Sequence, residues 1–470
     1  MTREILVGLD LGTTSAKAMA RDLLDRQVAL VETRTPWTSV SGGTHTGPEA
    51  LLALSIGLLT DVVRRAEDAV GPVRVLGVGV TGLAESGVLL DPTGSPCAPV
   101  IAWFDQRGGS ELERAGAGAA VLPEQFARRT GLPWDCQAGV AKLLWLQGTG
   151  MELTAGHRWL SVPEWVVHRL GGLLVREPSL ASRTGLVDQG TGTVWLEGVA
   201  AAGLPASLLP EPVAAGTGVG TLRFPGLPRS LQGAVLTVAG HDHPVAAVGV
   251  GAVGTDELFN SSGTADVIAR SLPGTLTDDQ RELLVRSGLS AGAHVVPDTT
   301  LVLGGVRGGL LLRRVLGALG AGDPAERDAL DRAALDVLDL PPGLEITGAG
   351  PTGDDVAVRL RDDVTPAAVW AAATRYTAAE TRSLIGAIER VVGPHRRAVA
   401  SGGWTRMESV RAAKRSAIAH LTFSDLPEPG VVGAALLAAT AAGVRASAVA
   451  VDVRQTPPPE PIPVISGGHP

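Results

Sequence analysis

One pattern occurs twice in this sequence: an apolar strand, a turn rich in Gly, Thr and Ser, and a second apolar strand. The first copy is ILVGLDLGTTSAKAMARD at residues 5–22, and the second is DELFNSSGTADVIARS at residues 256–271. The copies match weakly residue by residue, but the order of strand, turn and strand is the same. We interpret the pattern as an internal duplication, which predicts two related domains.

The length of the chain supports the same division, because 470 residues exceed the roughly 250 to 300 at which one hydrophobic core stops growing. Helical spacing of apolar residues at 48–71, followed by a second predicted hairpin at 73–91, indicates an α/β fold. A helix-rich stretch is expected at 123–171, and a strand, a polar turn and a helix at 231–254. In the second half we expect a strand in RRAVASGG and helices at 308–319, 366–391, 406–420 and 430–443.

Composition excludes several classes of protein. The net charge of −8 argues against a nucleic-acid partner, which requires a basic surface. The longest weakly apolar run, residues 430–444, is too short to span a bilayer. No secretory leader is recognisable at the N-terminus, and Cys97 and Cys136 fit a reducing cytoplasm, although a disulfide between them stays open. The proline-rich residues 451–470 are expected to be extended or disordered.

The first turn combines an acidic residue with small polar ones in DLGTTS, residues 10–15, followed by Lys17. An Asp at the end of an apolar strand is costly to bury unless it is hydrogen-bonded or faces a cation, which favours a magnesium-linked role for Asp10. The glycine permits the turn, and backbone NH groups with the hydroxyls of Thr13 and Thr14 can hold phosphate oxygens. A plain hairpin turn explains this segment alone equally well.

A matching turn, NSSGTA at residues 260–265, follows in the second copy. Two such turns facing each other across a cleft would hold the two ends of a triphosphate, whereas one Ser/Gly/Thr turn alone is more often structural. Gly402 and Gly403 follow a later strand, where glycine lets a flat adenine or ribose lie close to the backbone. A plain strand-to-helix turn explains these two glycines equally well.

The third polar turn is AGHDHP, residues 239–244, between an apolar strand and an apolar helix. A carboxylate at such a helix start can act as a general base that takes the proton from an acceptor hydroxyl, and Asp242 is the candidate. The alternative is that Asp242 only N-caps the helix. His241 and His243 suggest a metal site, but no further ligand cluster accompanies them in the sequence, so zinc is not predicted.

These turns, in this order and spacing, resemble the FGGY family of carbohydrate kinases. The segments that carry the resemblance are DLGTTSAKA, GVTGLAESGVLLDPTGSPCAPVIAWFDQR, EPSLASRTGLVD, AGHDHPVAAVG, SSGTAD, and SGGWTRM with the later GVVGAALLAA. The resemblance implies an α/β fold of two actin-like (ribonuclease H-like) ATPase domains with an interdomain cleft. Residues 1–252 would be the sugar-binding and first phosphate-clamp domain, residues 253–450 the nucleotide-binding domain, and residues 451–470 a tail.

Carried over position by position, the resemblance makes Asp10 the magnesium-associated acid and Asp242 the catalytic base. The residues that would contact ATP are Thr13, Thr14, Ser15, Lys17, Gly263, Thr264, Gly308, Gly402 and Gly403. The residues that would line the acceptor site are Thr81, Ala84, Glu85, Trp103, Gln137, Asp242 and His243. Glu85 and Ala84 fall where glycerol kinases have an Arg-Glu pair. A carboxylate there still accepts hydrogen bonds from two hydroxyls, so a neutral polyol or sugar fits. The alternative is that Glu85 is a surface acid of the loop.

The function implied by the resemblance is ATP-dependent phosphorylation of a hydroxyl of a small sugar or polyol, with ATP and Mg²⁺ as cofactors. The alternatives are a non-catalytic sugar- or ATP-binding regulator, an ATPase chaperone, and a degenerate kinase on the same superfold. The retained Asp10 and Asp242 favour the kinase. We expect a small-molecule partner, no nucleic acid, no membrane and a cytoplasmic location, and a homodimer stays open.

Overall fold

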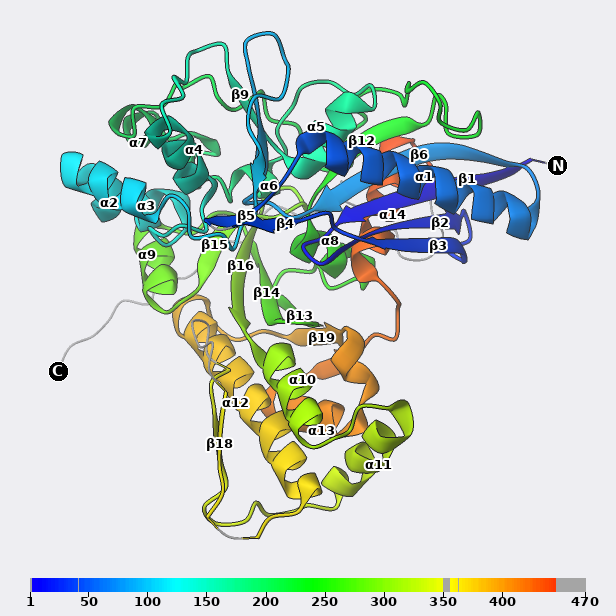
Figure 1. The fold of residues 1–470 in the computed structure, drawn as a ribbon, viewed down its shortest axis with the longest axis vertical. Coiled ribbons are helices and arrows are strands. Elements are labelled where there is room, and N and C mark those ends of the chain that lie inside the picture. The colour runs from blue at the N-terminus through cyan, green and yellow to red at the C-terminus, as the bar shows by residue number, and fades with distance from the viewer. Residues whose placement is uncertain (1, 41, 350–355, 362, 445–470) are drawn as a thin grey trace.

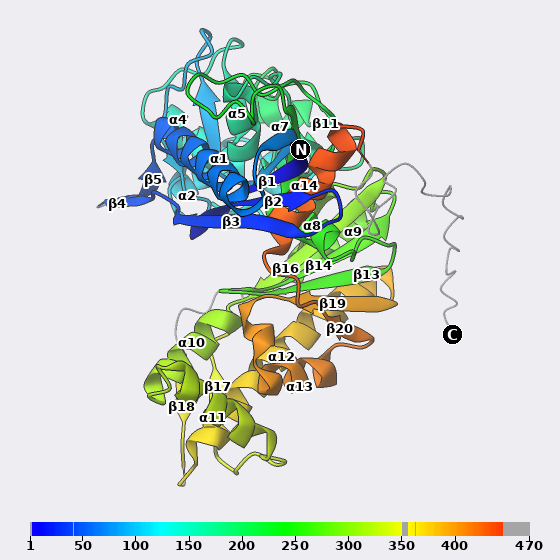
Figure 2. The same cartoon turned by 90° about the vertical axis from the view of Figure 1, so that its right-hand side faces the viewer.

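The computed structural model describes residues 2–40, 42–349, 356–361 and 363–444, so the predicted tail at 451–470 lies outside the described residues. The chain forms two lobes, which lie one above the other in Figure 1 and are separated more clearly in Figure 2. Each lobe has its own mixed sheet with helices packed on it. Among the described residues, no helix combines the length and the apolar character needed to cross a bilayer.

The sheet of the first lobe has the strand order β12-β6-β1-β2-β3. Its strands are β1 (Arg3–Leu11), β2 (Ser15–Asp22), β3 (Gln27–Arg34), β6 (Val73–Gly82) and β12 (Val235–His241). The first three form an antiparallel meander, while β6 runs parallel to β1 and β12 runs parallel to β6. The predicted β1–β2 hairpin is therefore confirmed.

The sheet of the second lobe repeats this arrangement in the order β15-β16-β14-β13-β19-β20. Its strands are β13 (Glu257–Ser262), β14 (Asp266–Pro273), β15 (Ser290–Ala293), β16 (Thr299–Val306), β19 (Arg397–Ser401) and β20 (Leu421–Phe423). As in the first sheet, an antiparallel trio is extended by two parallel strands, here β19 and β20. The shared topology confirms the duplication predicted from the two turns, and β15 is an added edge strand.

The predicted hairpin over residues 73–91 is wrong. Strand β6 has β1 and β12 as its neighbours, and the following strand β7 (Gly87–Leu90) pairs with β9 (Arg158–Ser161) instead. Two apolar strands joined by a short polar loop look like a hairpin in sequence, but β6 is already paired on both edges. The remaining short strands are β4 (Thr38–Val40), β5 (Gly43–Thr46), β8 (Val100–Ile101), β10 (Val187–Asp188), β11 (Thr193–Val194), β17 (Glu345–Thr347) and β18 (Ala357–Arg359).

Helices cover both sheets. Those that precede β13 are α1 (Pro48–Val70), α2 (Gly109–Gly118), α3 (Val121–Thr130), α4 (Gly139–Gly148), α5 (Val162–Arg169), α6 (Pro178–Ala181), α7 (Leu196–Ala201) and α8 (Asp242–Gly249). Those that follow are α9 (Asp278–Arg286), α10 (Gly308–Ala318), α11 (Pro324–Leu335), α12 (Pro366–Val392), the 3-10 helix η1 (Gly403–Arg406), α13 (Glu408–Ala417) and α14 (Pro429–Ala441).

The last helix, α14, returns to the first lobe, where it packs on β1, β6 and β12 and against α8. Glycines in the first sheet make this close approach possible. A Cβ atom at Gly8 would lie 2.0 Å from the carbonyl oxygen of Val431, and one at Gly79 would lie 2.1 Å from that of Ala434. Any side chain at these positions would therefore push the helix off the sheet. Although α14 belongs to the 253–450 segment, it completes the first lobe.

Candidate active site

The first turn lies at the end of the β1–β2 hairpin and is held in place by two tryptophans. The indole Nε1 of Trp37 donates to the carbonyl oxygen of Thr13 at 2.7 Å, and the Nε1 of Trp103 donates to the Thr13 hydroxyl at 2.8 Å. Thr14 is exposed, and Ser15 begins β2. Trp103, expected from sequence to line the acceptor site, thus lies beside the first turn.

Asp10 lies near the end of β1 and faces the cleft. Its Oδ1 atom is buried and has no hydrogen-bond partner among the described residues. Burial, reinforced by the negative charge of Asp242, raises the pKa of Asp10 to about 7, while Lys17 acts in the opposite direction. A carboxylate oxygen left without a donor in a buried site suits a hard cation, which prefers oxygen ligands. Asp10 therefore fits the magnesium-linked role predicted for it.

Lys17 lies opposite Asp10 on β2, and its ammonium group binds the carboxylate of Glu428. The distance from Lys17 Nζ to Glu428 Oε2 is 2.5 Å. Glu428 immediately precedes α14 and has a left-handed backbone conformation, with φ of 51°. This pair connects the first hairpin to the start of the last helix, so Lys17 is less free to meet a phosphate than its place in the sequence predicts.

The second turn lies at the end of the β13–β14 hairpin and is closed by a bond of 3.0 Å from the amide of Gly263 to the carbonyl oxygen of Ala265. Helix α10 starts directly beneath it. The amide of Leu310 donates to the carbonyl oxygen of Thr264 at 2.9 Å, and a Cβ atom at Gly309 would lie 1.8 Å from that of Gly263. Gly308, the glycine predicted to contact ATP, is buried and directly precedes Gly309 at the start of α10.

A buried lysine fixes the strand that follows this turn. Lys414 Nζ lies 2.7 and 2.8 Å from the two carboxylate oxygens of Asp266 and 2.8 Å from Asn260 Oδ1. The amide of Asn260 also donates to Asp266, at 2.8 Å. All three side chains are buried, so α13 is joined to the hairpin by a compact ionic cluster.

Asp242 is the first residue of α8 and follows β12 directly. The N-cap position belongs to His241, and no side-chain hydrogen bond caps this helix, so the structure does not support the N-cap alternative for Asp242. Its Oδ1 atom is buried without a hydrogen-bond partner among the described residues. Burial raises the pKa of Asp242 above its ordinary value; His243 and Arg183 counteract this rise.

One cavity of about 560 Å³ joins these parts. The predicted site residues that line it are Asp10, Lys17, Asp242, His243, Gly263, Gly402 and Gly403. Residues not predicted from sequence also line it, from the strand-to-helix turn at 401–406 and from the approach to α14 at 424–430. Asp10, Asp242 and Gly263, one residue from each polar turn, therefore line one cavity between the lobes. The other predicted site residues do not line it; they are Thr13, Thr14, Ser15, Thr81, Ala84, Glu85, Trp103, Gln137, Thr264 and Gly308.

Gly402 allows the wall of this cavity to approach the second turn. Its φ is +123°, and a Cβ atom there would lie 2.4 Å from the carbonyl oxygen of Ser262. We expect Gly402→Ala to lower the free energy of unfolding by about 1–3 kcal/mol and to weaken ADP binding, because the turn must shift. Gly403 is the matched control for stability, since a Cβ atom there meets nothing within 4 Å. Chemical denaturation and ADP titration measure both effects, and equal stability of the two variants would contradict the prediction.

The predicted acceptor loop divides into two parts. Thr81 is buried, and its hydroxyl donates to the carbonyl oxygen of Gly240 at 2.7 Å, while Ala84 belongs to the hydrophobic core. These two residues support the sheet instead of facing the cavity. Glu85 is different, because its carboxylate Oε1 accepts a hydrogen bond of 2.8 Å from Arg183 Nε. Glu85 is therefore not a surface acid of the loop.

Arg183 connects the two lobes next to this carboxylate. Its Nη1 donates to the hydroxyl of Ser290 on β15 at 2.8 Å, while its Nε binds Glu85. The side chains of Arg183 and Glu85 are only 13% and 12% exposed. The same guanidinium counteracts the upward pKa shift of Asp242, so it lies close enough to influence the candidate base.

Lys142 joins the loop that contains Trp103 and Asp105 to the loop that contains Cys136. Its buried ammonium group donates to the carbonyl oxygens of Trp103 at 3.3 Å and Asp105 at 3.0 Å, and also to that of Cys136. Gln137, the next residue in the chain, is exposed. Both cysteines of the chain are free thiols, so the disulfide left open by the sequence does not form.

Sequence reasoning missed Arg183, Lys414 and Glu428. Arg183 is the only basic residue in the segment EPSLASRTGLVD. A single basic residue in this segment could have marked Arg183 as a candidate site residue. Glu428 precedes the Pro-Gly pair that opens α14, which marks it as a helix-start residue. Lys414 gave no signal, because its partners lie about 150 residues away in the chain.

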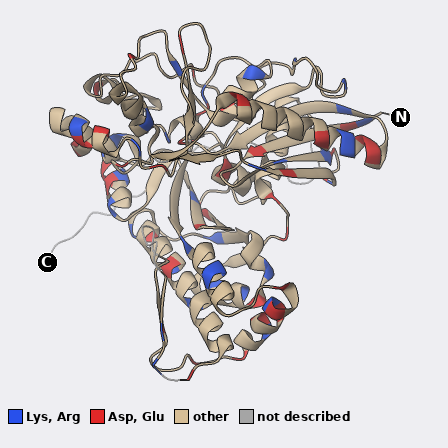
Figure 3. Cartoon of the chain, in the orientation of Figure 1, with Lys and Arg blue, Asp and Glu red and all other residues tan. Residues whose placement is uncertain are grey.

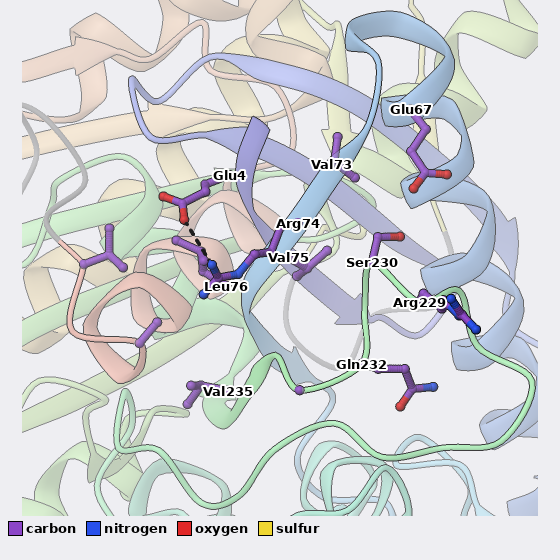
Figure 4. Close-up of a pocket in the computed structure, with 13 residues that line it drawn as sticks. Glu4, Glu67, Val73, Arg74, Val75, Leu76, Arg229, Ser230, Gln232 and Val235 are labelled. Carbon is purple, nitrogen blue, oxygen red and sulfur yellow. Dashed lines mark ion pairs between the residues drawn. The ribbon is translucent and has the colours of Figure 1, made fainter. Parts of the chain in front are cut away.

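A more voluminous cavity, of about 790 Å³, lies at the opposite end of β1 and β6. Figure 4 shows its charged lining, with Glu4 facing Arg74 and with Glu67 and Arg229 on the far side. The distance between Arg74 Nη1 and Glu4 Oε1 is 3.6 Å. None of the three polar turns reaches it, so volume alone does not identify the candidate site.

Comparison with known proteins agrees with this geometry. The N-terminal domain model of the FGGY family of carbohydrate kinases matches residues 5–249, more than half of the chain. Over 274 residues the chain is 27% identical to L-fuculokinase from Salmonella typhi, a match that covers 57% of each protein. Over 249 residues it is 29% identical to glycerol kinase from Shewanella amazonensis, covering 51% of this chain and 48% of that one. The chain thus spans about half the length of these curated relatives.

Solved structures extend the likeness to nearly the whole chain. Xylulose kinase from Rhodospirillum rubrum has a TM-score of 0.77 at 24% identity, covering 93% of this chain and 89% of that one. Glycerol kinase from Plasmodium falciparum, solved with ADP, has a TM-score of 0.79 at 16% identity, covering 93% and 89%. These likenesses confirm the predicted two-domain, actin-like ATPase fold. With the match of the family model, they establish that the chain belongs to the FGGY family of carbohydrate kinases.

Proposed function

We propose that this protein is an ATP-dependent kinase that phosphorylates a hydroxyl group of a small sugar or polyol. One observation carries the proposal: a single cavity is lined by Lys17 and Gly263 from the two duplicated hairpins and by Asp10 and Asp242. Each of the two acids has a buried oxygen without a hydrogen-bond partner among the described residues. Family membership supports it, as do the names of the relatives, which are sugar and polyol kinases. The proposed site has two parts, a phosphate clamp from the two hairpins and a base at Asp242.

In the proposed reaction, Asp242 accepts the proton of the acceptor hydroxyl as that oxygen attacks the γ-phosphorus of ATP in line with the leaving group. The backbone amides of the two turns bind the phosphate oxygens. The raised pKa of Asp242 strengthens it as a base, and the loss of water from a closed cleft limits futile ATP hydrolysis. Asp10 would hold Mg²⁺, which when bound neutralises charge on the phosphates.

We also propose the division of labour between the domains. Residues 1–252 would carry the acceptor site and the first turn, and residues 253–450 would bind the nucleotide. Lysine and arginine are interspersed with acidic residues on both lobes (Figure 3), which fits a small-molecule partner better than a nucleic acid.

The test is a screen of acceptor-dependent ADP release from Mg-ATP across polyols, pentuloses, hexuloses and aldonates. We expect one class to stimulate release far above the rate without acceptor, and mass spectrometry to find the phosphorylated product. ATP binding without release for any acceptor would support the alternative, a non-catalytic binder on the same fold, and would overturn the kinase proposal.

Arg183 gives a second prediction for the acceptor side. Arg183→Gln removes a charge-assisted bond to Glu85, worth about 1.5–3 kcal/mol, so we expect the KM for the acceptor to rise about 10- to 100-fold. The KM for ATP should change little, because Arg183 does not line the nucleotide cavity. Steady-state kinetics in both substrates measure the split. A rise confined to the KM for ATP would contradict the assignment of Glu85 to the acceptor.

A further inference from the structure

Three consecutive residues, His241, Asp242 and His243, direct their polar atoms toward one point. The Nε2 atom of His241 lies 3.2 Å from Asp242 Oδ1, and the Nε2 atom of His243 lies 3.8 Å from the same oxygen. One ligand atom from each residue lies within 4.8 Å of the others. This convergence arises because β12 ends at His241, which is extended, and α8 begins at Asp242. Three neighbours in a regular strand would alternate between faces.

The contacts within this cluster are not ordinary hydrogen bonds. Asp242 Oδ1 is buried and has no hydrogen-bond partner among the described residues, although two ring nitrogens lie close to it. A buried carboxylate oxygen without a donor is costly. A cation between the three atoms would use the lone pairs of all of them.

The spacing fits a metal of ordinary size. Zinc binds imidazole nitrogen at about 2.0–2.1 Å and carboxylate oxygen at about 2.0–2.2 Å, so ligand atoms in a tetrahedral site lie about 3.3–3.5 Å apart. The separations of 3.2 and 3.8 Å from the two imidazoles to Asp242 Oδ1 bracket this value, and all three ligand atoms lie within 4.8 Å of one another. Two imidazoles also favour zinc and its neighbours over Mg²⁺, which prefers oxygen ligands. The cluster is therefore chemically distinct from the oxygen site at Asp10.

We propose that His241, Asp242 and His243 form a binding site for a divalent transition-metal ion, Zn²⁺ in chemical class, and that its occupation inhibits the enzyme. Three protein ligands leave a fourth position open toward the cavity, which Asp242 and His243 line. Binding itself depends only on the cluster. The inhibition rests on the proposed function, because a metal on Asp242 would occupy the lone pair needed to accept the acceptor proton. Sequence reasoning looked for ligands outside the tripeptide, whereas the third ligand is the candidate base within it.

The test is metal titration of the full chain after treatment with a chelator, in the absence of substrate. Co²⁺ serves as the probe for visible absorption and Zn²⁺ for calorimetry. We expect one equivalent to bind, and His243→Ala and Asp242→Asn each to weaken binding at least tenfold. His168→Ala is the matched control, since His168 is a partly buried histidine on α5 whose Nδ1 pairs with the carbonyl oxygen of Gly172. We use His243 because it is partly exposed, and circular dichroism checks that each variant folds.

The outcomes separate this proposal from the kinase proposal. Binding of one equivalent that is lost in both cluster variants and kept in His168→Ala supports the site, whether or not any acceptor is phosphorylated. Binding that is absent, or that survives in both cluster variants, overturns it. If the chain is an active kinase, buffered free Zn²⁺ with excess Mg-ATP should inhibit acceptor-dependent ADP release, and chelation should reverse the effect. Tight binding without inhibition would overturn the regulatory part alone.

Discussion

Replacing Asp242 with asparagine is expected to lower the rate of acceptor phosphorylation by about 10²- to 10⁴-fold, the usual contribution of a positioned general base. Asparagine keeps the shape of the side chain but cannot accept the proton. Because the Asp242 side chain caps no helix in this structure, the change removes chemistry without removing a helix cap. Single-turnover measurements of product formation at saturating ATP report the chemical step directly.

The control for this variant is nucleotide binding, since the two hairpin turns are unchanged. Titration with ADP should give an affinity within a few-fold of the parent protein, and the thermal midpoint should not fall, because neutral asparagine relieves the burial of a carboxylate. Parent-like turnover in the variant would show that another group accepts the proton. If the variant loses both ADP binding and turnover, the cleft has misfolded.

Replacing Lys414 with methionine is expected to lower the free energy of unfolding by about 3–5 kcal/mol, the typical effect of leaving one charge of a buried pair without its partner. Among the described residues, the buried carboxylate of Asp266 would keep the side-chain amide of Asn260 as its remaining side-chain donor. Because Asp266 begins β14 directly after the second turn, ADP affinity should fall as well. Urea denaturation and ADP titration measure these two effects.

The neighbouring residue supplies a matched control. Arg415 pairs with Glu408 at 2.6 Å on the same helix, but both side chains are 50% exposed. Exposed pairs contribute about 0–1 kcal/mol, so Arg415→Ala should change stability little. Similar losses of stability in the two variants would mean that helix α13, and not the buried ion cluster, sets the effect.

Local patterns predicted the parts of this fold that depend on neighbours in the chain. Both hairpins and the strand-to-helix turn at Asp242 were recognisable because a strand, a turn and the next element follow each other directly. The pairing of β7 with β9 was not, since its register joins Gly87 to Ser161 and leaves no trace in either segment. The sequence therefore predicted where these turns lie but not every strand that supports them.

The same limit applies to the candidate site. Asp10 and Asp242 stand out because an acid at the end of an apolar strand needs a reason to be there. Arg183 and Lys414 act through partners about 100 and 150 residues away, so their roles depend on tertiary contacts. The convergence of His243 on Asp242 likewise depends on backbone geometry at a strand-to-helix junction. The spacing of these residues in the sequence does not show that their side chains lie close together in the folded chain.

The position of α14 has a consequence for how the chain is made. Domains generally fold as units while the N-terminal part leaves the ribosome first. Here the glycine-lined face of β1 and β6 stays uncovered until residues 429–441 have been translated, because α14 is the helix that covers it. The lobe that is synthesised first is therefore completed last, and a chain interrupted within the second lobe would expose the face of an unfinished sheet.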